Sequence, residues 1–333
     1  MSAGATKPTA VRPDLSVVIL SWNTKDLLLR CLETVAAAEQ PPTRETIVVD
    51  NASSDGSADA ADARFPGVHL IRNPRNDGYA RGNNIGIRAS RGRHVLLLNS
   101  DTEVAPGAFR ALVNFLDANP NYGAVGARLW NVDGTIQRAC MRFPTLATAL
   151  FHDAAPGRWW PDNAVIRRHF YKDFDHVASR DVEQPPGAAL CVRREVFEKV
   201  GLLDEELFLF FNDVDFCRRV LRAGWRIRYL ADANMVHHGG ASTSRYPAFA
   251  AEYFRNKIAY YRIHHGALGE ALMRFVTRWR GREEKAKLLA SMKPPELDAA
   301  LRGVSDALRT ALTRDPRGRG VIAELADPTI RVS

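Results

Sequence analysis

Residues 15–50, LSVVILSWNTKDLLLRCLETVAAAEQPPTRETIVVD, decide the fold class. A short run rich in valine, isoleucine and leucine (15–20) is followed by a helical pattern (25–38) and by a second apolar run (45–50). Short apolar strands that alternate with helices are typical of a parallel sheet covered by helices on both faces. The stretch therefore predicts an α/β fold.

The same alternation continues to about residue 104 and becomes less regular after it. Further strands are predicted at 68–71 and 94–98, and further helices at 57–64 and 79–90. In the second half, 140–181 is expected to be irregular, and two short strands are predicted at 225–230 and 234–238. We expect the following organisation: a flexible lead-in over 1–14, one domain over 15–245 with halves at 15–104 and 105–245, and a helical, basic extension over 246–333.

Composition limits the classes of protein that this chain can belong to. With 333 residues, 46% of them apolar and 25% charged, the sequence is typical of a globular protein. The net charge of +8 favours anionic partners, but the basic residues are dispersed and match no nucleic-acid-binding module. The four cysteines are far apart in sequence, which predicts reduced, mostly buried thiols.

The sequence also indicates where the protein is found. Its first residues lack the apolar core of a signal peptide, and no run is long and apolar enough to span a membrane. We therefore expect a cytoplasmic protein, either soluble or peripheral at the inner face of the membrane.

Small polar residues follow three of the predicted strands. In open α/β sheets ligands bind beyond the carboxyl ends of the strands, so these positions are candidates for a binding site. After the fourth strand, an amide and a carboxylate could hold a divalent cation, although a strand followed by an Asx turn gives the same pattern. The candidates are Ser21, Trp22, Asp50, Asn51, Asn99 and Asp101.

A segment rich in glycine and asparagine, residues 73–87, lies between the third and fourth predicted strands. Gly78 would let the backbone approach a ligand closely, and the amides of Asn83 and Asn84 could supply hydrogen bonds. The spacing matches neither the dinucleotide-binding fingerprint nor a P-loop.

Seven motifs in series resemble the inverting glycosyltransferases of family 2, which share the GT-A fold. The sequences of these motifs are most similar to those of the rhamnosyltransferase-like branch of bacterial surface-polysaccharide enzymes. The resemblance covers residues 15 to about 245. The motifs are SVVILSWN (16–23), VVDNASSDGS (48–57), NDGYARGNNIG (76–86), LLLNSDTEV (96–104), PGAALCVRR (186–194), LDEELFLFFNDVDFCRR (203–219) and MVHHGGAS (235–242).

The resemblance implies a nucleotide-sugar donor, such as dTDP-rhamnose or a UDP-sugar, bound by the half over 15–104. The residues implied to line its base pocket are Ser21, Trp22, Asp50 and Asn51. Asp101 matches the last aspartate of the family's metal-binding signature and would bind Mg²⁺ or Mn²⁺, while Asn99 stands where the first aspartate is usual. His237 or His238 would complete the metal site, with Glu103 as a further candidate.

On the acceptor side, the resemblance implies that Asp213 is the general base of a single displacement with inversion. A plain helix cap is the alternative role for Asp213, and Asn212 stands where the family usually has glutamate. Gly187 and Ala188 match positions that shape the acceptor pocket, although close strand packing would equally favour small residues. From helical spacing alone, Asp215 is expected to pair with Arg219.

Two regions remain open at this stage. The basic amphipathic pattern within 267–313 suits contact with a membrane that carries polyprenyl-diphosphate-linked glycan acceptors, or a helix packed on the catalytic domain. The aromatic segment 151–174 could contact sugars, lipid headgroups or its own core. A non-catalytic glycan- or nucleotide-binding module is the main functional alternative, whereas SWNTKD after the first strand argues against a sugar nucleotidyltransferase.

Overall fold

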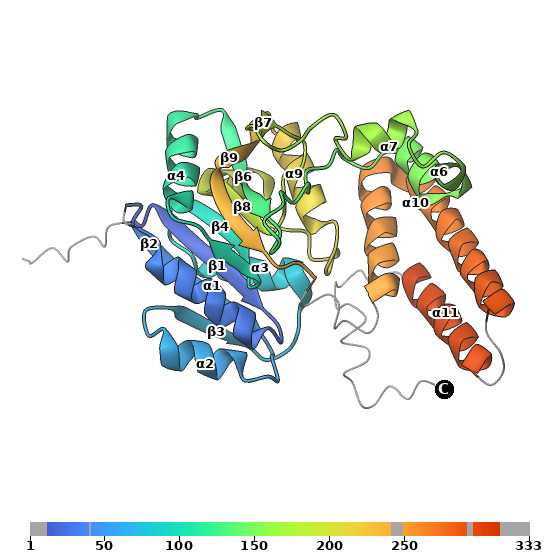
Figure 1. Ribbon diagram of the computed structural model, residues 1–333, viewed down its shortest axis with the longest axis horizontal. Helices are drawn as coiled ribbons and strands as arrows, with labels where there is room; N and C mark the ends of the chain where they lie inside the picture. The colour runs from blue at the N-terminus through green and yellow to red at the C-terminus, as the bar shows by residue number, and fades with distance from the viewer. Residues whose placement is uncertain (1–11, 40, 241–248, 292–295, 314–333) are drawn as a thin grey trace, which may run out of the picture.

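The computed structural model describes residues 12–39, 41–240, 249–291 and 296–313, so most of the predicted lead-in lies outside the described residues. Within them a single sheet of nine strands has the order β3-β2-β1-β4-β8-β6-β9-β5, with β7 paired to β9 (Figure 1). The strands are β1 Leu15–Ser21, β2 Arg44–Asn51, β3 His69–Asn73, β4 His94–Asn99, β5 Thr102–Val104, β6 Tyr122–Trp130, β7 Arg180–Asp181, β8 Ala189–Arg193 and β9 Arg226–His237.

The first four strands form the parallel part of the sheet, which confirms the prediction for the first half of the chain. β1 is central and pairs with β2 on one side and β4 on the other. Ser21 lies opposite Asp50, and Leu20 lies opposite Asn99, so the three strands end at the same edge. The sheet therefore gathers the polar residues that follow these strands along one edge.

The remaining strands extend the same sheet with mixed directions. β8 is antiparallel to both β4 and β6, and β9 is parallel to β6. The halves predicted at 15–104 and 105–245 thus share one sheet. The two short strands predicted near 225–230 and 234–238 are one strand, β9, whose register against β6 shifts where the apolar pattern is interrupted.

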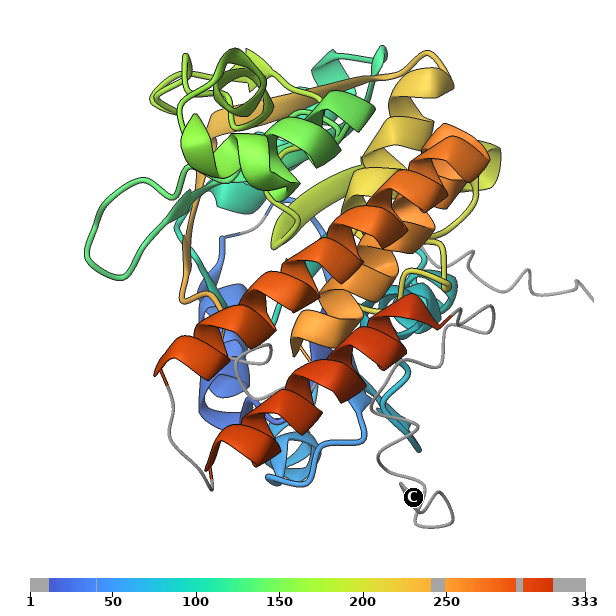
Figure 2. The ribbon, with the colours of Figure 1, turned by 90° about the vertical axis from the view of Figure 1, so that its right-hand side faces the viewer.

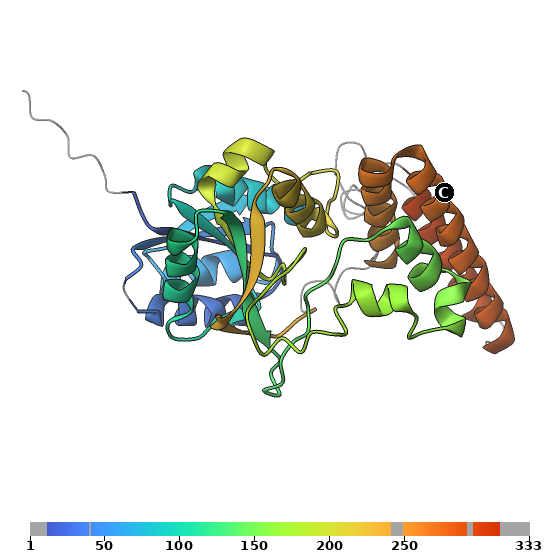
Figure 3. The ribbon, with the colours of Figure 1, turned by 90° about the horizontal axis from the view of Figure 1, so that it is seen from above.

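Helices cover both faces of the sheet, because successive side chains of a strand point to opposite sides (Figure 3). Val17 and Ile19 belong to one apolar cluster, and Val18 belongs to the other. The first cluster includes residues of α1 (Lys25–Ala37), α2 (Ser57–Arg64) and α4 (Ala108–Ala118), and the second includes residues of α3 (Gly78–Ala89), α8 (Arg194–Val200) and α9 (Asn212–Arg222). All four cysteines are buried and free, as predicted.

A helical layer lies beside the sheet and confirms the predicted helical C-terminal region (Figure 2). Gly266 has non-helical angles, so α10 consists of two helical segments. The segment 140–181, predicted to be irregular, also contains short helices, one of them a π-helix labelled η1. The layer comprises α5 (Leu146–Thr148), η1 (Ala149–Asp153), α6 (Ala155–Trp159), α7 (Ala164–His169), α10 (Phe249–Ser291) and α11 (Glu296–Leu312).

The apolar side of the basic pattern near residue 275 is turned mainly toward the protein. Val276 is fully buried, and Leu272 and Trp279 pack against a third apolar cluster, whereas Phe275 is 63% exposed. This packing agrees with the alternative in which the basic pattern within 267–313 belongs to helices packed on the catalytic domain. In the described ranges, no helix is both long enough and apolar enough to cross a membrane.

Candidate active site

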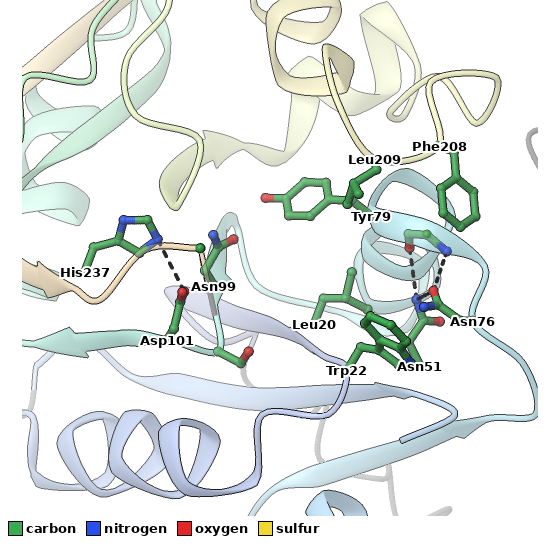
Figure 4. Close-up of a pocket in the computed structure, with 13 residues that line it drawn as sticks. Leu20, Trp22, Asn51, Asn76, Tyr79, Asn99, Asp101, Phe208, Leu209 and His237 are labelled. Atoms are coloured by element: carbon green, nitrogen blue, oxygen red, sulfur yellow. Dashed lines mark hydrogen bonds and ion pairs between the residues drawn. The ribbon is translucent and has the colours of Figure 1, made fainter. Parts of the chain in front are cut away.

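The carboxyl edge of the parallel strands borders a cleft of about 290 Å³, here called the first cleft. Trp22, Asn51 and Asn76 lie at one end of it, and Asp101 and His237 lie at the other (Figure 4). The first cleft therefore has one end rich in amides and aromatic surface and one end with a carboxylate and an imidazole.

Asn51 is fixed by the turn before α3. Its side-chain nitrogen donates to Asn76 Oδ1 (2.9 Å) and to the carbonyl of Gly78 (3.1 Å). Gly78 has a positive φ of 76°, and a Cβ there would lie 2.5 Å from the carbonyl oxygen of Phe208. Only glycine suits this close crossing of two chain segments. The amide end of the cleft is thus rigid.

Several predicted residues support the first cleft without lining it. Ser21 is buried and shares a hydrogen bond with Thr24 (3.1 Å). Asn83 donates to the carbonyl of Tyr79 (2.9 Å), and Asn84 donates to the carbonyl of Leu203 (2.9 Å). These three side chains form hydrogen bonds within the protein. The sequence had led us to expect contacts with a ligand instead.

Asp50 also lies behind the wall of the first cleft. Its Oδ2 atom accepts a hydrogen bond from the backbone N–H of Ser53 (3.1 Å). Its Oδ1 atom is buried and has no hydrogen-bond partner among the described residues. A buried acceptor without a partner is unusual in a folded protein. Asp50 therefore retains the capacity to accept one more hydrogen bond.

At the other end, His237 Nε2 lies 3.3 Å from Asp101 Oδ1. The other ring nitrogen, Nδ1, lies 2.9 Å from Gln137 Oε1, and the Gln137 amide is oriented by its bond to Asn131. Nδ1 therefore carries the proton, and a neutral ring presents a lone pair to the Asp101 carboxylate. Two lone pairs face each other, an arrangement that suits a cation bound by both groups.

His238 takes a different direction from its neighbour. Its Nε2 atom lies 2.7 Å from Glu103 Oε1, and neither residue lines the first cleft. In the described part of the chain, no group of three or more His, Cys, Asp or Glu side chains is arranged to hold a metal ion. Asp101 and His237 together offer two ligands, so any metal ion here needs further ligands from a bound molecule.

A second cleft of about 390 Å³ adjoins the first and shares Tyr79, Asn99, Leu209 and His237 with it. Asp213 lies in its wall, in the first turn of α9. Gln184 Nε2 donates to Asp213 Oδ2 (3.2 Å). Gly187 and Ala188 also line this cleft, and a Cβ on Gly187 would lie 2.4 Å from Asp213 Oδ2. A larger residue at 187 would displace the carboxylate.

Burial raises the pKa of the Asp213 carboxyl above its usual range, although Val214 N–H and Gln184 donate hydrogen bonds to it. The position of Asp213 in the first turn of α9 would favour the ionised form, because backbone N–H groups point out of a helix at its N-terminus. Desolvation outweighs that effect, because the half-buried carboxylate is surrounded by protein atoms. A raised pKa makes this carboxylate a better proton acceptor than an exposed one.

Asp215, two residues further along α9, has the structural role that helical spacing predicts. Its side chain is 2% exposed and pairs with Arg219 (2.7 Å) and with His264 (2.8 Å). Burial alone would raise its pKa, but these two partners hold the pKa of Asp215 below its ordinary value. Asn212 is also buried, and its amide donates to the carbonyl of Leu207 (3.3 Å).

Sequence reasoning missed several residues of the two clefts. Neither Gln137 nor Gln184 belongs to a motif, although Gln184 lies two residues before PGAALCVRR. Tyr79 follows Gly78 in a motif that was noticed, and its hydroxyl donates to the carbonyl of Gly187 (3.2 Å). Lys257 comes from α10, far from every motif. Only packing brings these side chains to the clefts.

Comparison with known proteins gives the family. The model of "Glycosyltransferase like family 2" matches residues 13–262. The N-acetylglucosaminyl-diphospho-decaprenol L-rhamnosyltransferase of Mycobacterium tuberculosis is 31% identical over 245 residues, which cover 70% of this chain and 79% of the relative. The dTDP-rhamnosyl transferase RfbF of Shigella flexneri is 25% identical over 231 residues, which cover 67% and 69%.

Among solved structures, a mannosyltransferase from Pyrobaculum calidifontis in complex with GDP-Man and Mn²⁺ aligns with a TM-score of 0.49 and 19% identity, over 98% of this chain and 79% of that one. A similarity of that size supports no inference about function. The family match covers most of the chain, and the relatives named above are rhamnosyltransferases. The chain therefore belongs to family 2 of the glycosyltransferases, in the rhamnosyltransferase-like branch, and has the GT-A fold.

Proposed function

We propose that this glycosyltransferase moves a sugar, with inversion, from a nucleoside-diphosphate sugar in the first cleft to a hydroxyl group of a glycan in the second cleft. The single observation that carries the proposal is the position of Asp213. Its carboxylate lies in the wall of the second cleft, which adjoins the first cleft and shares four lining residues with it. A hydroxyl group in the second cleft can therefore face a base and a donor at once.

The first cleft supports binding of the donor at both ends. Trp22 offers an aromatic face for a base, and Asn51 holds the adjoining turn. At the other end, Asp101 and His237 present a carboxylate oxygen and an imidazole nitrogen, which suit Mg²⁺ or Mn²⁺. Asp101 and His237 would hold such an ion together with the donor's diphosphate, and the ion would supply positive charge against the charge that develops on the leaving group.

Asp213 acts as the general base in this proposal. It takes the proton of the acceptor hydroxyl while the oxygen attacks the anomeric carbon from the side opposite the diphosphate. General-base catalysis typically contributes about 10²–10⁴-fold in rate. Gln184 and Gly187 keep the carboxylate in place, the first by a hydrogen bond and the second by leaving room. No covalent sugar–enzyme intermediate is required.

For the donor and the acceptor we propose dTDP-rhamnose and a lipid-linked glycan. The support is the printed description of the relatives, of which one acts on a diphospho-decaprenol-linked acceptor and another is a dTDP-rhamnosyl transferase. A lipid-linked acceptor would bring the reaction to the surface of a membrane.

The test is the substitution Asp213→Asn. We expect transfer to fall by at least about 10²-fold, while the donor still raises the melting temperature of the variant in the presence of Mg²⁺ or Mn²⁺. Asp232→Asn, a change of the same kind at an exposed site on β9, serves as the matched control. Transfer at the wild-type rate in Asp213→Asn would refute the proposed base.

The non-catalytic alternative makes a different prediction. A binding module would give a thermal shift with a nucleotide sugar but no transfer and no hydrolysis across a panel of donors and metals. The position of Asp213 favours the enzyme, because its carboxylate lies in the wall of the second cleft, where the hydroxyl group of an acceptor can reach it.

A further inference from the structure

The two clefts meet at four residues that line both of them: Tyr79, Asn99, Leu209 and His237. With the donor in the first cleft and the acceptor in the second, the transferred sugar passes this junction. One of the four, Tyr79, connects two distant parts of the chain, because its hydroxyl donates to the carbonyl of Gly187 (3.2 Å), 108 positions further on. Its ring points from α3 toward the end of the first cleft where Asn99 lies (Figure 4).

Tyr79 is held in place by its own backbone. Its N–H donates to the carbonyl of Phe208 (2.7 Å), and its carbonyl accepts a hydrogen bond from the side chain of Asn83 (2.9 Å). Burial raises the pKa of the Tyr79 hydroxyl, and the charges of Asp213 and Asp101 raise it further. The hydroxyl therefore keeps its proton and remains a hydrogen-bond donor.

The carbonyl that Tyr79 contacts belongs to residues 184–188, here called the 184–188 segment, which supports the proposed base. Gln184 Nε2 donates to Asp213 Oδ2 (3.2 Å). Gly187 packs against the same oxygen, since a Cβ at this position would lie 2.4 Å from it. The position of the 184–188 segment therefore sets the position of the Asp213 carboxylate.

The 184–188 segment is anchored at its two ends but has few anchors in its middle. Its first residue exchanges two backbone hydrogen bonds with Met141 (3.0 and 3.1 Å), and the N–H of Asn99 donates to the carbonyl of its last residue, Ala188 (2.9 Å). Its second and third residues are prolines, which have no N–H to donate. The hydrogen bond from Tyr79 thus restrains a stretch that has few means to restrain itself.

We propose that Tyr79 is a positioning residue of the transfer reaction: its hydroxyl fixes the 184–188 segment so that Asp213 faces the hydroxyl group that it deprotonates. The inference rests on the proposed function, in which Asp213 is the base. It separates Tyr79 from a residue that only binds the donor, because loss of the hydroxyl should slow the chemical step and leave donor binding intact.

The experiment measures hydrolysis of dTDP-rhamnose by the full chain with Mg²⁺ or Mn²⁺, so that water takes the place of the acceptor. The water oxygen attacks the anomeric carbon, the bond from that carbon to the diphosphate breaks, dTDP leaves with the electron pair, and the proton of the water goes to Asp213. Tyr79→Phe keeps the ring and removes the hydroxyl. We expect kcat to fall about 5- to 10-fold, with KM for the donor and the donor's thermal shift unchanged.

Tyr229→Phe is the matched control. The Tyr229 hydroxyl also donates to a backbone carbonyl, that of His176 (2.9 Å), but Tyr229 is buried in the core and lines neither cleft. This variant loses the same kind of hydrogen bond, so it should turn over the donor at the wild-type rate.

A double variant tests the path of the effect. Gly187→Ala already displaces the Asp213 carboxylate, so Tyr79→Phe should cost less in that background than in the wild type. The combined loss in kcat should therefore be smaller than the product of the two single losses.

The inference is supported when kcat falls in Tyr79→Phe but not in Tyr229→Phe, and when the double variant shows the smaller combined loss. It is overturned by a wild-type kcat in Tyr79→Phe, by an equal loss in Tyr229→Phe, or by single losses that multiply. A higher KM for the donor with an unchanged kcat also overturns it, because Tyr79 would then serve donor binding.

Failure of the proposed function gives a different result. If the wild type hydrolyses no nucleotide sugar, or if Asp213→Asn hydrolyses the donor at the wild-type rate, the proposed function fails and the inference fails with it. If the wild type hydrolyses the donor, Asp213→Asn does not, and Tyr79→Phe matches the wild type, only the role of Tyr79 fails.

Discussion

The two clefts of this enzyme are built in different ways. The first cleft lies at the carboxyl edge of neighbouring parallel strands, and most of its lining residues come from the ends of β1, β2 and β4, from the residues that follow β1 and β4, or from the start of α3. The second cleft takes its walls from segments between residues 79 and 257, which are distant in sequence. The cleft proposed for the donor is thus fixed by the order of the parallel strands, and the cleft proposed for the acceptor depends on packing between remote elements.

This difference suggests two readouts for every variant: the thermal shift given by a nucleotide sugar with its metal, and the rate of transfer to an acceptor. Changes in the first cleft should affect both measurements. Changes in the second cleft should reduce transfer alone. Changes beneath the clefts should reduce the stability of the fold.

The largest effect is expected beneath the second cleft, at Asp215. Asp215→Ala leaves Arg219 and His264 without their buried carboxylate, which should lower the free energy of unfolding by about 3 kcal/mol or more. Denaturant unfolding measures it. Because the pKa of Asp215 is lowered in the fold, its ionised form stabilises the protein above pH 3.8, and the difference from wild type should narrow as the pH falls below that value.

Asp306→Ala is the control for this change, since its ion pair with Arg309 is exposed on α11. It should leave stability unchanged within error. Wild-type stability in Asp215→Ala would show that Asp215 does not anchor α9.

The next effect concerns the proposed metal-binding end of the first cleft, where two adjacent histidines differ in their contacts. His237→Ala removes the imidazole that faces Asp101 and should lower metal-dependent transfer by about 100-fold and the metal-dependent thermal shift with it. His238→Ala, which loses only a contact with Glu103, should change neither by much. The opposite order of effects would assign the metal to the other histidine and contradict the geometry of the first cleft.

In the second cleft, Gly187→Ala places a methyl carbon 2.4 Å from Asp213 Oδ2, too close for the carboxylate to keep its position. Displacing a catalytic group by about 1 Å can lower the rate by up to about 10²-fold, so transfer should fall about 10- to 100-fold while the donor's thermal shift stays the same. Gly67→Ala, at a site with no atom within 4 Å of the new Cβ, should be silent in both measurements. A loss of donor binding in Gly187→Ala would mean that the clefts are not separable.

The smallest effect is expected from Gln184→Leu, which removes a hydrogen bond that favours the ionised form of Asp213. The pKa of Asp213 then rises further. Because the base works only when ionised, the acidic limb of the kcat/KM profile should move to higher pH, with less than about a tenfold loss at neutral pH.

Gln137→Leu tests whether this shift is specific to Asp213. Gln137 contacts His237 instead, so the substitution should leave the acidic limb in place and raise the metal concentration needed for half-maximal activity. An acidic limb that does not move in Gln184→Leu would remove Gln184 from the environment of the base.

Much of the fold could be predicted from local patterns. The alternation of apolar runs and helical segments up to residue 104 predicted the parallel strands, because the pattern that marks each strand or helix lies within that element. The pairing of Asp215 with Arg219 was predicted for the same reason, since residues four apart lie on one face of a helix. The single strand β9 was predicted as two, because its register shift interrupts the apolar pattern.

The candidate site was predicted less completely. Motifs named Asp101, Asn51 and Asp213, all of which line a cleft. They also named Asn83 and Asn84, whose amides instead donate hydrogen bonds to the backbone carbonyls of Tyr79 and Leu203. An amide in a motif looks the same in the sequence whether it binds a ligand or a neighbouring loop, so only the contacts could separate the two roles.

The sequence by itself determined the class of fold, the family and the edge of the sheet at which polar side chains gather, since the periodicity of apolar residues and the motifs that follow each strand are local features. The tertiary structure decided which histidine faces Asp101, how burial raises the pKa of Asp213, and how Lys257 reaches the second cleft from α10. These features depend on desolvation and on contacts between segments far apart in the chain. No local pattern of residues records them.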